Sequence, residues 1–224
     1  MSTKFEGNSN IVTTNQEGIH KNLKDIVSKY SFENYKRPLA DFSKEVWGEI
    51  LKWIGEEEVI FDLGCGIGAS SIYLSKKYPN VKVVGIDKSV SRLDRKNDFK
   101  NNLNQNINLF RGELLDLIPL IYKDYKSKVI NIHSIYLLYP NPYPKKIHVK
   151  RRFHGSPICI YLYNIKLPII LRSNWKLYLD EFSFVGNLFQ RSSVIEKVEN
   201  PELMTPFEEK FYRSGQDIFE LRLP

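Results

Sequence analysis

A glycine-rich turn between an apolar run and a helical segment constrains the fold of this chain more than any other feature. Residues 59–71 read VIFDLGCGIGASS, which places Gly64, Gly66 and Gly68 where a strand would turn into a helix. Glycine lets the backbone turn sharply and approach a ligand closely. The spacing is G-x-G-x-G and differs from the G-x-G-x-x-G of dinucleotide-binding folds. The turn therefore predicts a ligand site at the end of a strand in an α/β sheet.

The chain after this turn alternates apolar runs with helical segments, which is typical of a parallel α/β sheet. Strands are predicted over residues 59–63, 81–86, 107–110, 133–138, 175–179, 194–198 and 218–223. Helices are predicted over residues 43–53, 69–77, 89–103 and 114–122, with a further one inside 153–171. The pattern predicts one sheet of seven strands with helices between them.

The length and composition favour one soluble domain. With 224 residues, of which 42% are hydrophobic, the chain can bury one sizeable core. We expect a single domain over residues 18–224 and a mobile arm over residues 1–17, which are polar and without periodicity. The formal net charge of +7 favours an acidic partner. We expect a monomer or a weak homodimer.

The cysteines and histidines predict neither disulfides nor a metal site. Two cysteines, Cys65 and Cys159, cannot make a disulfide framework, and Cys65 has no CxxC or histidine partner at ligand spacing. No signal peptide or long apolar span stands out in the sequence. We therefore expect a cytoplasmic protein without a metal and without a membrane contact.

Three acids follow or precede the turns at the ends of predicted strands. Asp62 comes just before the glycines, Asp87 ends the second strand in VVGIDKS, and Glu113 follows the third strand in RGELLDL. A carboxylate is well suited to accept hydrogen bonds from both hydroxyls of a ribose. Each acid also has a structural interpretation. Asp62 would accept hydrogen bonds from the loop amides, and Asp87 would cap the helix at Ser89. Glu113 would stabilise a helix N-terminus through the helix dipole.

A proline-rich and basic segment, Tyr139–Arg152, reads YPNPYPKKIHVKRR. Three prolines within five residues forbid a helix and make a stiff, extended loop after an apolar strand. The lysines and arginines that follow suit a site facing a polyanion. The alternative is a proline-rich turn that leads into a solvated helix.

The acid-led glycine loop together with Asp87 resembles class I S-adenosylmethionine-dependent methyltransferases. In that class the glycine loop passes under the methionine part of the cofactor, and the acid after strand two accepts both ribose hydroxyls. The resemblance implies a Rossmann-like, seven-stranded methyltransferase sheet, mostly parallel with a C-terminal antiparallel strand and helices on both faces. It implies that S-adenosylmethionine contacts a set of six residues: Asp62 near its amino group, Gly64, Gly66, Gly68, Asp87 at its ribose, and Glu113 at its adenine.

The proline-rich segment resembles the bacterial tRNA (guanine-N7) methyltransferases, which carry P-D-P-W-P-K followed by a histidine and K-R-R. The stretch TPFEEKFYRSGQDIFEL resembles their C-terminal T-x-Y-E-x-K-F, and WKLYLDEF resembles their fifth strand ending in T-D. The resemblance implies methyl transfer to guanine N7 of tRNA, with Asn141 at the catalytic position. It implies contacts to the substrate from Tyr143, Lys145, Arg151, Arg152, Asp180, Thr205 and Glu208.

This chain departs from the family pattern at three positions. Asn141 and Tyr143 stand where the family has Asp and Trp, and Asp62 stands where it has Glu. Guanine N7 already carries an in-plane lone pair, so attack on the methyl group needs no general base, and alignment in a dry pocket dominates the rate. Asn141 can still accept a hydrogen bond, without charge assistance. We therefore predict a slower enzyme that keeps its activity.

The same asparagine leaves other functions open. Asn141-Pro142-Tyr143 resembles the N-P-P-Y loop of methyltransferases that act on exocyclic amines, in which an aromatic ring stacks on the flat substrate. A divergent relative acting on a small heteroaromatic molecule is a further alternative. So is a relic that binds the cofactor or tRNA without catalysis.

Overall fold

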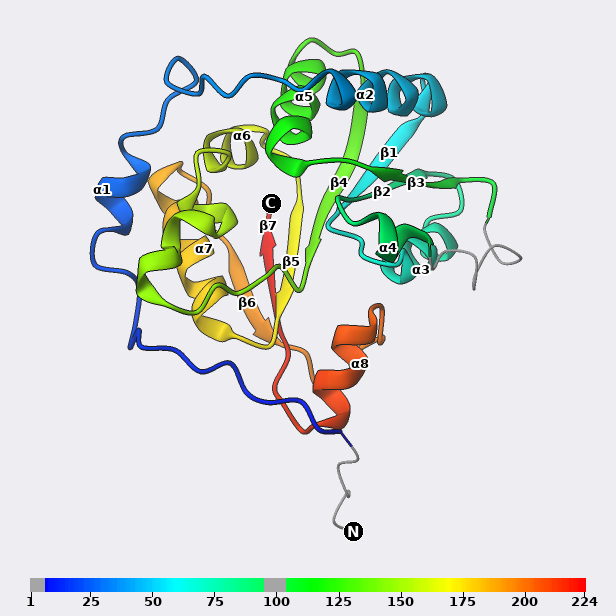
Figure 1. The fold of residues 1–224 in the computed structure, drawn as a ribbon. Coiled ribbons are helices and arrows are strands. Elements are labelled where there is room, and N and C mark those ends of the chain that lie inside the picture. Colours follow the sequence, from blue (N-terminus) through cyan, green and yellow to red (C-terminus); the bar gives the residue numbers. More distant parts are fainter. Residues whose placement is uncertain (1–6, 95–103) are drawn as a thin grey trace.

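The computed structural model describes residues 7–94 and 104–224, and its centre is one seven-stranded sheet (Figure 1). The strand order is β3-β2-β1-β4-β5-β7-β6. The strands are β1 (Glu58–Leu63), β2 (Lys82–Asp87), β3 (Ile107–Arg111), β4 (Asn131–Leu138), β5 (Ile169–Ser173), β6 (Val194–Lys197) and β7 (Phe219–Leu223). The first five in this order are parallel to one another, and β7 is antiparallel to both β5 and β6. The predicted mostly parallel sheet with an antiparallel C-terminal strand is confirmed.

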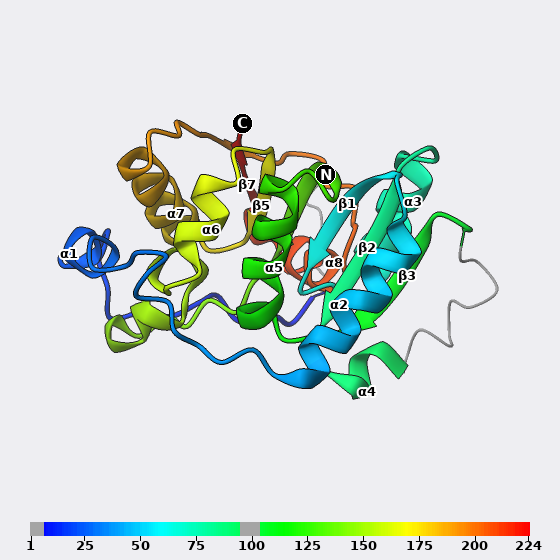
Figure 2. The ribbon, with the colours of Figure 1, turned by 90° about the horizontal axis from the view of Figure 1, so that it is seen from above.

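Helices cover both faces of the sheet (Figures 1 and 2). They are α1 (Leu23–Val27), α2 (Asp41–Ile54), α3 (Ala69–Lys77), α4 (Val90–Leu93), α5 (Leu114–Lys126), α6 (Cys159–Asn164), α7 (Lys176–Leu188) and α8 (Pro206–Arg213). Alternate residues of β1 belong to different apolar clusters: Val59 and Phe61 pack with α2 and α5, whereas Ile60 packs with α3. This alternation follows from the two-residue period of a strand. It gives the sheet one apolar layer on each face.

Helix α5 contains a proline whose cost is offset by a distant tyrosine. Pro119 has no backbone N–H, so the carbonyl of Leu115 lacks its helical partner. The Tyr35 hydroxyl donates to that carbonyl at 2.5 Å. The loop before α2 is thereby fixed against α5.

The prediction of a strand over residues 175–179 is wrong. The fifth strand is β5, and the tryptophan-containing stretch caps and begins helix α7. The buried residues Tyr178, Leu179, Phe182 and Val185 recur at intervals of three and four, which is the period of a helix. The apolar run after Pro168 supplies the strand instead, so the number of strands stays at seven while the fifth lies earlier.

The helix predicted inside residues 153–171 is shorter than expected. Two 3-10 helices, Lys146–Arg151 and Phe153–Gly155, precede the short α6. Of the helix predicted over residues 89–103, α4 is the part that the structure describes, and residues 95–103 lie outside the described chain. Within the described ranges, no helix is long and apolar enough to span a bilayer.

Residues 7–17 do not form a free arm. They run from the end of α8 to the proline-rich loop and on towards α1, as the dark blue segment of Figure 1 shows. Hydrogen bonds tie this segment to Arg213, Ser214, Gln216 and Pro144. Residues 7–17 therefore have defined contacts, residues 1–6 lie outside the described chain, and the mobility of residues 1–17 stays a prediction.

Candidate functional site

A cavity of about 470 Å³ opens at the carboxyl ends of β1, β4 and β5. Ligands of open α/β sheets bind at this edge because the loops there project into a common crevice. Its wall has four parts: the glycine loop with the start of α3, the segment Leu138–Pro142, the end of β5 at Ser173 and Asn174, and helix α8. The cavity therefore joins segments that are far apart in the sequence.

The glycine loop has the backbone that only glycine adopts without strain. The φ angles of Gly64, Gly66 and Gly68 are 89°, 61° and 88°. A Cβ atom on Gly64 or Gly66 would meet nothing within 4 Å, so both face open space in the cavity wall. A Cβ on Gly68 would lie 2.4 Å from Leu109 Cδ1. The first two glycines leave room for a ligand, and the third allows close packing of α3 on the sheet.

Asp62 is buried beneath this loop and has an unused acceptor. Ser70 and Ser71 donate to its Oδ2 at 2.6 and 2.7 Å, while Oδ1 has no hydrogen-bond partner in the part of the chain described. Burial raises the pKa of Asp62 to about 6, although the two serine hydroxyls oppose the shift. An unpaired buried acceptor is costly unless a donor completes it. Asp62 lies behind the cavity wall and is not part of it, so its contact with the amino group of a ligand stays a prediction.

Asp87 ends β2 and fixes the glycine loop. Its Oδ2 accepts from Gly66 N at 3.0 Å, and its Oδ1 accepts from Ser89 N at 2.8 Å. Arg92, which lines the cavity, lies 3.5 Å from Oδ2. Both interpretations of this acid are therefore compatible. It caps the turn into α4, and it lies beside the loop where a ribose would bind.

Glu113 occupies the N-terminus of α5 and accepts a weak hydrogen bond from Leu115 N at 3.4 Å. The negative charge of its carboxylate stabilises the N-terminus of α5 through the helix dipole. The side chain is half-buried and is not part of the cavity wall. A contact with a ligand at this position stays a prediction.

The segment after β4 makes a tight turn around Asn141. Tyr139 and Tyr143 have φ angles of 52° and 43°, a region that non-glycine residues rarely adopt. Asn141 Oδ1 accepts from Tyr143 N at 3.3 Å, which closes the turn through a side chain. Asn141 and the prolines on both sides of it line the cavity. The turn therefore directs its backbone and its amide group towards a ligand.

Two of the predicted cationic residues lie on the outer side of this turn. Lys145 and Arg151 are exposed, and the Arg151 guanidinium lies 5.8 Å from the centre of the Tyr143 ring. Lys146 and Lys150 are exposed beside them. These exposed charges follow the Asn141 turn in the sequence, and none of them belongs to the described cavity wall. We call Lys145, Lys146, Lys150 and Arg151 the basic rim below.

Arg152 has internal partners in this structure, and its contact with a phosphate or with the target base stays a prediction. Its side chain is 0% exposed, forms an ion pair with the fully buried Glu181 and stacks on Trp175 with 4.9 Å between guanidinium and ring centre. His154 Nε2 also hydrogen-bonds Glu181, at 2.8 Å. A buried arginine is stable only when its charge has a counter-charge and its N–H groups have hydrogen-bond acceptors. Arg152 is therefore part of the interior beneath the proline-rich loop.

Glu208 is also taken up by internal contacts. Its Oε1 accepts from Arg172 Nη1 at 2.6 Å, and its Oε2 accepts from Met204 N at 3.1 Å. Burial raises the pKa of Glu208, and Arg172 opposes that rise. The side chain is fully buried in this structure, and its contact with a guanine or a ribose stays a prediction. Arg172 further pairs with Glu220, which ties α8 to β5 and β7.

Thr205 caps helix α8 and lines the cavity at the same time. Its Oγ1 accepts from Glu208 N at 3.0 Å, with Pro206 at the first helical position. The capping role and a contact with a ligand are compatible, since both residues belong to the wall. Phe207 follows them and is 51% exposed at the mouth of the cavity.

Asp180 does not lie at the end of a strand. It is on α7, where it pairs with Lys176 at 2.6 Å, and it borders a different hollow near Ile19 and Phe184. The residues that do follow the fifth strand into the cavity are Ser173 and Asn174. Asp180 is therefore not part of the cavity wall, whereas Asn174 is, and a substrate contact of Asp180 stays a prediction. The apolar run after Pro168 was the signal that could have located Asn174.

The sequence reasoning also missed several residues of the cavity wall. They are Val12, Arg92, Tyr139, Asn174 and Phe207. Tyr139 has a buried hydroxyl with no hydrogen-bond partner among the described residues, and its ring lies 5.5 Å from that of Phe211. None of the described residues that line the cavity is an acid. The wall is thus apolar and aromatic, with amides, hydroxyls and one guanidinium.

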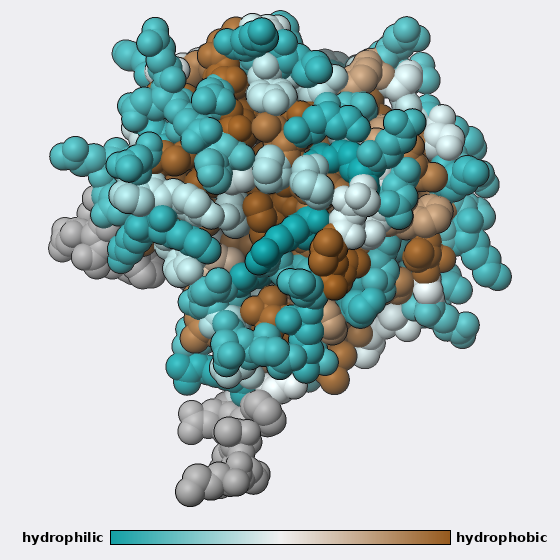
Figure 3. All heavy atoms as spheres, turned by 180° about the vertical axis from the view of Figure 1, so that it is seen from behind, coloured by the Kyte–Doolittle hydropathy of each residue, from teal (hydrophilic) through white to brown (hydrophobic). Residues whose placement is uncertain are grey.

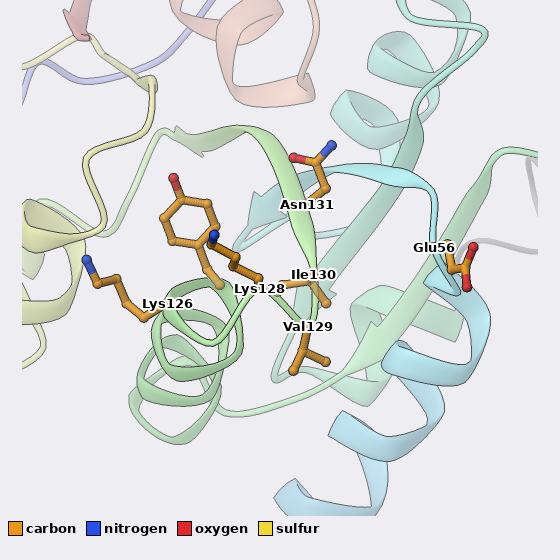
Figure 4. Close-up of a pocket in the computed structure, with 7 residues that line it drawn as sticks. Glu56, Lys126, Lys128, Val129, Ile130 and Asn131 are labelled. Carbon is orange, nitrogen blue, oxygen red and sulfur yellow. The ribbon is translucent and has the colours of Figure 1, made fainter.

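The opposite edge of the sheet has a second hollow, of about 530 Å³, around the loop between α5 and β4. Figure 4 shows its side chains: Lys126 and Lys128 lie on one side, Glu56 lies at the end of α2, and the labelled groups do not converge on one point.

In the described ranges, no cluster of three or more histidine, cysteine or acidic side chains could hold a metal ion. Seen from behind (Figure 3), hydrophilic side chains cover most of the surface and hydrophobic ones form small patches. The chemistry therefore concentrates at the carboxyl edge.

A family model and two relatives of known name are similar to this chain. The family model described as "Putative methyltransferase" matches residues 56–221. The tRNA (guanine-N(7)-)-methyltransferase of Staphylococcus haemolyticus is 24% identical over 194 residues, spanning 82% of this chain and 88% of the relative. The protein of that name from Alkaliphilus metalliredigens is 27% identical over 184 residues, spanning 74% and 81%.

A solved structure supports the fold. A variant of the 16S rRNA (adenine(1408)-N(1))-methyltransferase from Catenulisporales acidiphilia, with its cosubstrate SAM, superimposes with a TM-score of 0.53. The alignment covers 83% of this chain and 92% of the other, at 14% identity. At that identity the likeness establishes the fold and nothing about the substrate.

Proposed function

This chain belongs to the methyltransferase family whose model covers residues 56–221, and we propose that it transfers a methyl group from S-adenosylmethionine to guanine N7 of tRNA. The observation that supports the proposal is the single cavity shared by the glycine loop, the Asn141 turn and Thr205. These are the motifs that resemble the tRNA (guanine-N7) methyltransferases. The similar proteins from S. haemolyticus and A. metalliredigens bear that activity in their names.

The residues around the glycine loop fit the cofactor. S-adenosylmethionine supplies a methyl group on a sulfonium, together with a charged amino group and a ribose. Asp62 offers the amino group an acceptor without a partner, and the open space beside Gly64 and Gly66 lets the backbone approach the methionine part. Asp87 lies at the end of β2, where it can accept ribose hydroxyls while it holds Gly66. Glu113 would reach the adenine.

The other half of the cavity suits a flat acceptor that needs no base. An N7 lone pair attacks without loss of a proton, so the wall must align the ring and exclude water. Asn141 and Asn174 offer amide groups, and Thr205 offers a hydroxyl. The exposed Phe207 at the mouth can stack on a base. The lack of an acid in the described wall agrees with a reaction that needs no general base.

The basic rim would bind the tRNA backbone. Lys145, Lys146, Lys150 and Arg151 are exposed and close to the Asn141 turn. Such cations neutralise phosphates and give affinity that falls with salt, with little sequence preference. They would bring a guanine to the cavity mouth.

Methyl transfer to tRNA tests this function. The protein is incubated with cofactor labelled in its methyl group and with unmodified tRNA, and the label in the RNA is counted. We expect label in tRNA, less of it as the salt concentration rises, and none with a small heteroaromatic acceptor in place of RNA. A protein that binds the cofactor and leaves tRNA unlabelled would contradict the proposal.

The Asn141 turn favours one second candidate, methylation of an exocyclic amine. Asn141 Oδ1 and the carbonyls of the flanking prolines are acceptors at the cavity, as an amino group would require. That reaction needs an acceptor that holds an amine hydrogen and directs the nitrogen lone pair, and an Asp carboxylate at position 141 would supply one as well. The two candidates are therefore separated by the identity of the methylated nucleoside, which carries the label on an exocyclic amine in one case and on guanine N7 in the other.

A further inference from the structure

The N-terminal segment connects the end of α8 with the proline-rich loop. We call residues 8–16 the strap. Near its start, Ser9 N donates to Ser214 Oγ at 3.0 Å, and Gln216 Nε2 donates to Ser9 O at 2.8 Å. These contacts fix the strap to the end of α8. Val12, in the middle of the strap, lines the cavity.

The far end of the strap holds the proline-rich loop by its backbone. Thr14 Oγ1 donates to the carbonyl of Pro144 at 2.6 Å. Asn15 Oδ1 accepts from Lys146 N at 3.0 Å. A loop rich in proline has few N–H groups with which to fix itself, so side chains from elsewhere must supply the partners.

Gln16 continues this contact into the interior. It is 5% exposed, its Oε1 accepts from Arg152 Nη1 at 3.2 Å, and its Nε2 donates to Glu181 Oε1 at 2.5 Å. Arg152 in turn donates through Nε and Nη2 to the carbonyl of Tyr143, at 3.3 and 3.0 Å. Gln16 therefore completes the shell of a guanidinium that binds the turn next to the cavity.

Tyr143 connects this network to the acceptor side of the site. Its φ of 43° is strained, and such a conformation persists only where the surroundings determine it. Arg152 binds its carbonyl and Asn141 Oδ1 binds its N–H, so the orientation of the Asn141 side chain depends on the Tyr143 backbone. A continuous chain of contacts thus runs from Gln16 through Arg152 and Tyr143 to Asn141.

From these contacts we infer that Asn15 and Gln16 are positioning residues, which act through Arg152 and the proline-rich loop to hold Asn141 in the orientation needed for methyl transfer. The effect on rate rests on the function proposed above. The effect on the loop does not, because the hydrogen bonds exist whatever the acceptor is.

Single substitutions in the strap test the inference by separating kcat from cofactor binding. Asn15→Ala removes the acceptor from Lys146 N, whereas Asn15→Asp keeps an oxygen there and should restore the rate. Gln16→Ala removes both contacts with the buried pair. We expect Asn15→Ala and Gln16→Ala to lower kcat about tenfold or more, since small misplacements of a reacting group are costly. The cofactor Kd should change less than about twofold, because the glycine loop is untouched.

Asn10→Ala is the matched control, since Asn10 is an exposed asparagine of the same strap. It should leave kcat unchanged. If Asn15→Ala and Gln16→Ala lower only the melting temperature, and kcat well below that temperature equals the wild-type value, the inference is overturned. The same holds if Asn15→Asp fails to restore any of the lost rate.

Amide hydrogen exchange distinguishes a failure of this inference from a failure of the proposed function. In the full-length protein with S-adenosylmethionine, the Lys146 amide should exchange faster in Asn15→Ala than in the wild type or in Asn10→Ala. This result is expected even if tRNA proves not to be the acceptor. Equal exchange rates in residues 140–150 for all three proteins would refute the positioning role directly.

Discussion

The side chain of Asn141 connects the turn after β4 to the chemistry of the cavity. Replacement by Asp preserves the acceptor that closes the turn on Tyr143 N and restores the charge found at this position in the family. Because N7 attack requires no base, we predict that Asn141→Asp keeps or raises kcat with tRNA. Asn141→Ala, which opens the turn, should lower kcat about tenfold or more. Steady-state methylation assays on both variants check this, and loss of activity in Asn141→Asp would contradict the prediction.

A pH dependence of cofactor binding belongs to Asp62. Its pKa is raised to about 6 by burial, so the group is largely protonated below that pH when no cofactor is bound. A positively charged amino group binds the ionised form. The cofactor affinity should therefore fall, by up to about tenfold per pH unit, as the pH drops below 6.

Calorimetric titration of the cofactor between pH 5 and 8 measures this dependence. Asp62→Asn should bind more weakly at pH 8 and show a flat profile across the range. A wild-type affinity that is the same at pH 5 and pH 8 would remove Asp62 from the amino-group site.

At this scale, local sequence located the glycine side of the cavity and missed part of the opposite wall. The glycines and Asp87 could be predicted because strand, turn and helix lie within thirty residues of one another. The roles of Arg152 and Glu208 could not, because their partners Glu181 and Arg172 come from distant segments. A charged residue reads as exposed until its buried counter-charge is known.

Among the elements, the segment between β4 and β5 shows what the sequence could and could not provide. The prolines predicted an irregular loop, and the loop is present. The strand after it was placed on the tryptophan-containing stretch, although Ile169–Ser173 forms it. A short apolar run after a proline fits a buried strand as well as a helix end, and pairing with β4 and β7 decides between them.

Helix α7 stabilises the proline-rich loop through Glu181. Burial alone would raise the pKa of Glu181, but its hydrogen bond to His154 and the charge of Arg152 lower it to about 2. Because the folded pKa lies below the ordinary value of 4.5, this stabilisation is present above pH 4.5 and is lost as the pH falls towards 2.

Glu181→Gln tests this contribution, because it leaves Arg152 buried without its counter-charge. We expect a loss of about 3 kcal/mol in the free energy of unfolding at pH 7, measured by urea denaturation. The part of the acid destabilisation that occurs between pH 4.5 and 2 should be smaller in the variant. An unfolding free energy equal to that of the wild type would show that the pair contributes nothing net.

At the scale of the whole molecule, we assign tRNA binding to part of the excess positive charge. The residues of the basic rim are exposed, so each should contribute to tRNA affinity in a salt-dependent way. Arg151→Ala should weaken binding to all tRNAs alike and reduce the slope of log affinity against log salt by about one. Filter binding at several salt concentrations measures the slope. Lys44→Ala, on α2 and paired with Asp41, is the control and should leave the slope unchanged.

The fold as a whole was predictable because apolar runs and helical segments alternate along the chain, whereas the strap was not. Residues 7–17 carry no periodic apolar pattern, so composition indicated a mobile arm. Their order comes from partners in α7, α8 and the proline-rich loop. These partners are far from the strap in the sequence, so local composition could not predict the contacts.

The identity of the methylated nucleoside shows whether this chain transfers the methyl group to guanine N7 of tRNA. After reaction with unmodified tRNA and labelled cofactor, the RNA is digested to nucleosides and the labelled product is identified by mass spectrometry. The account predicts 7-methylguanosine as the labelled nucleoside. Label in N6-methyladenosine or another amine-methylated nucleoside, with none in 7-methylguanosine, would contradict it.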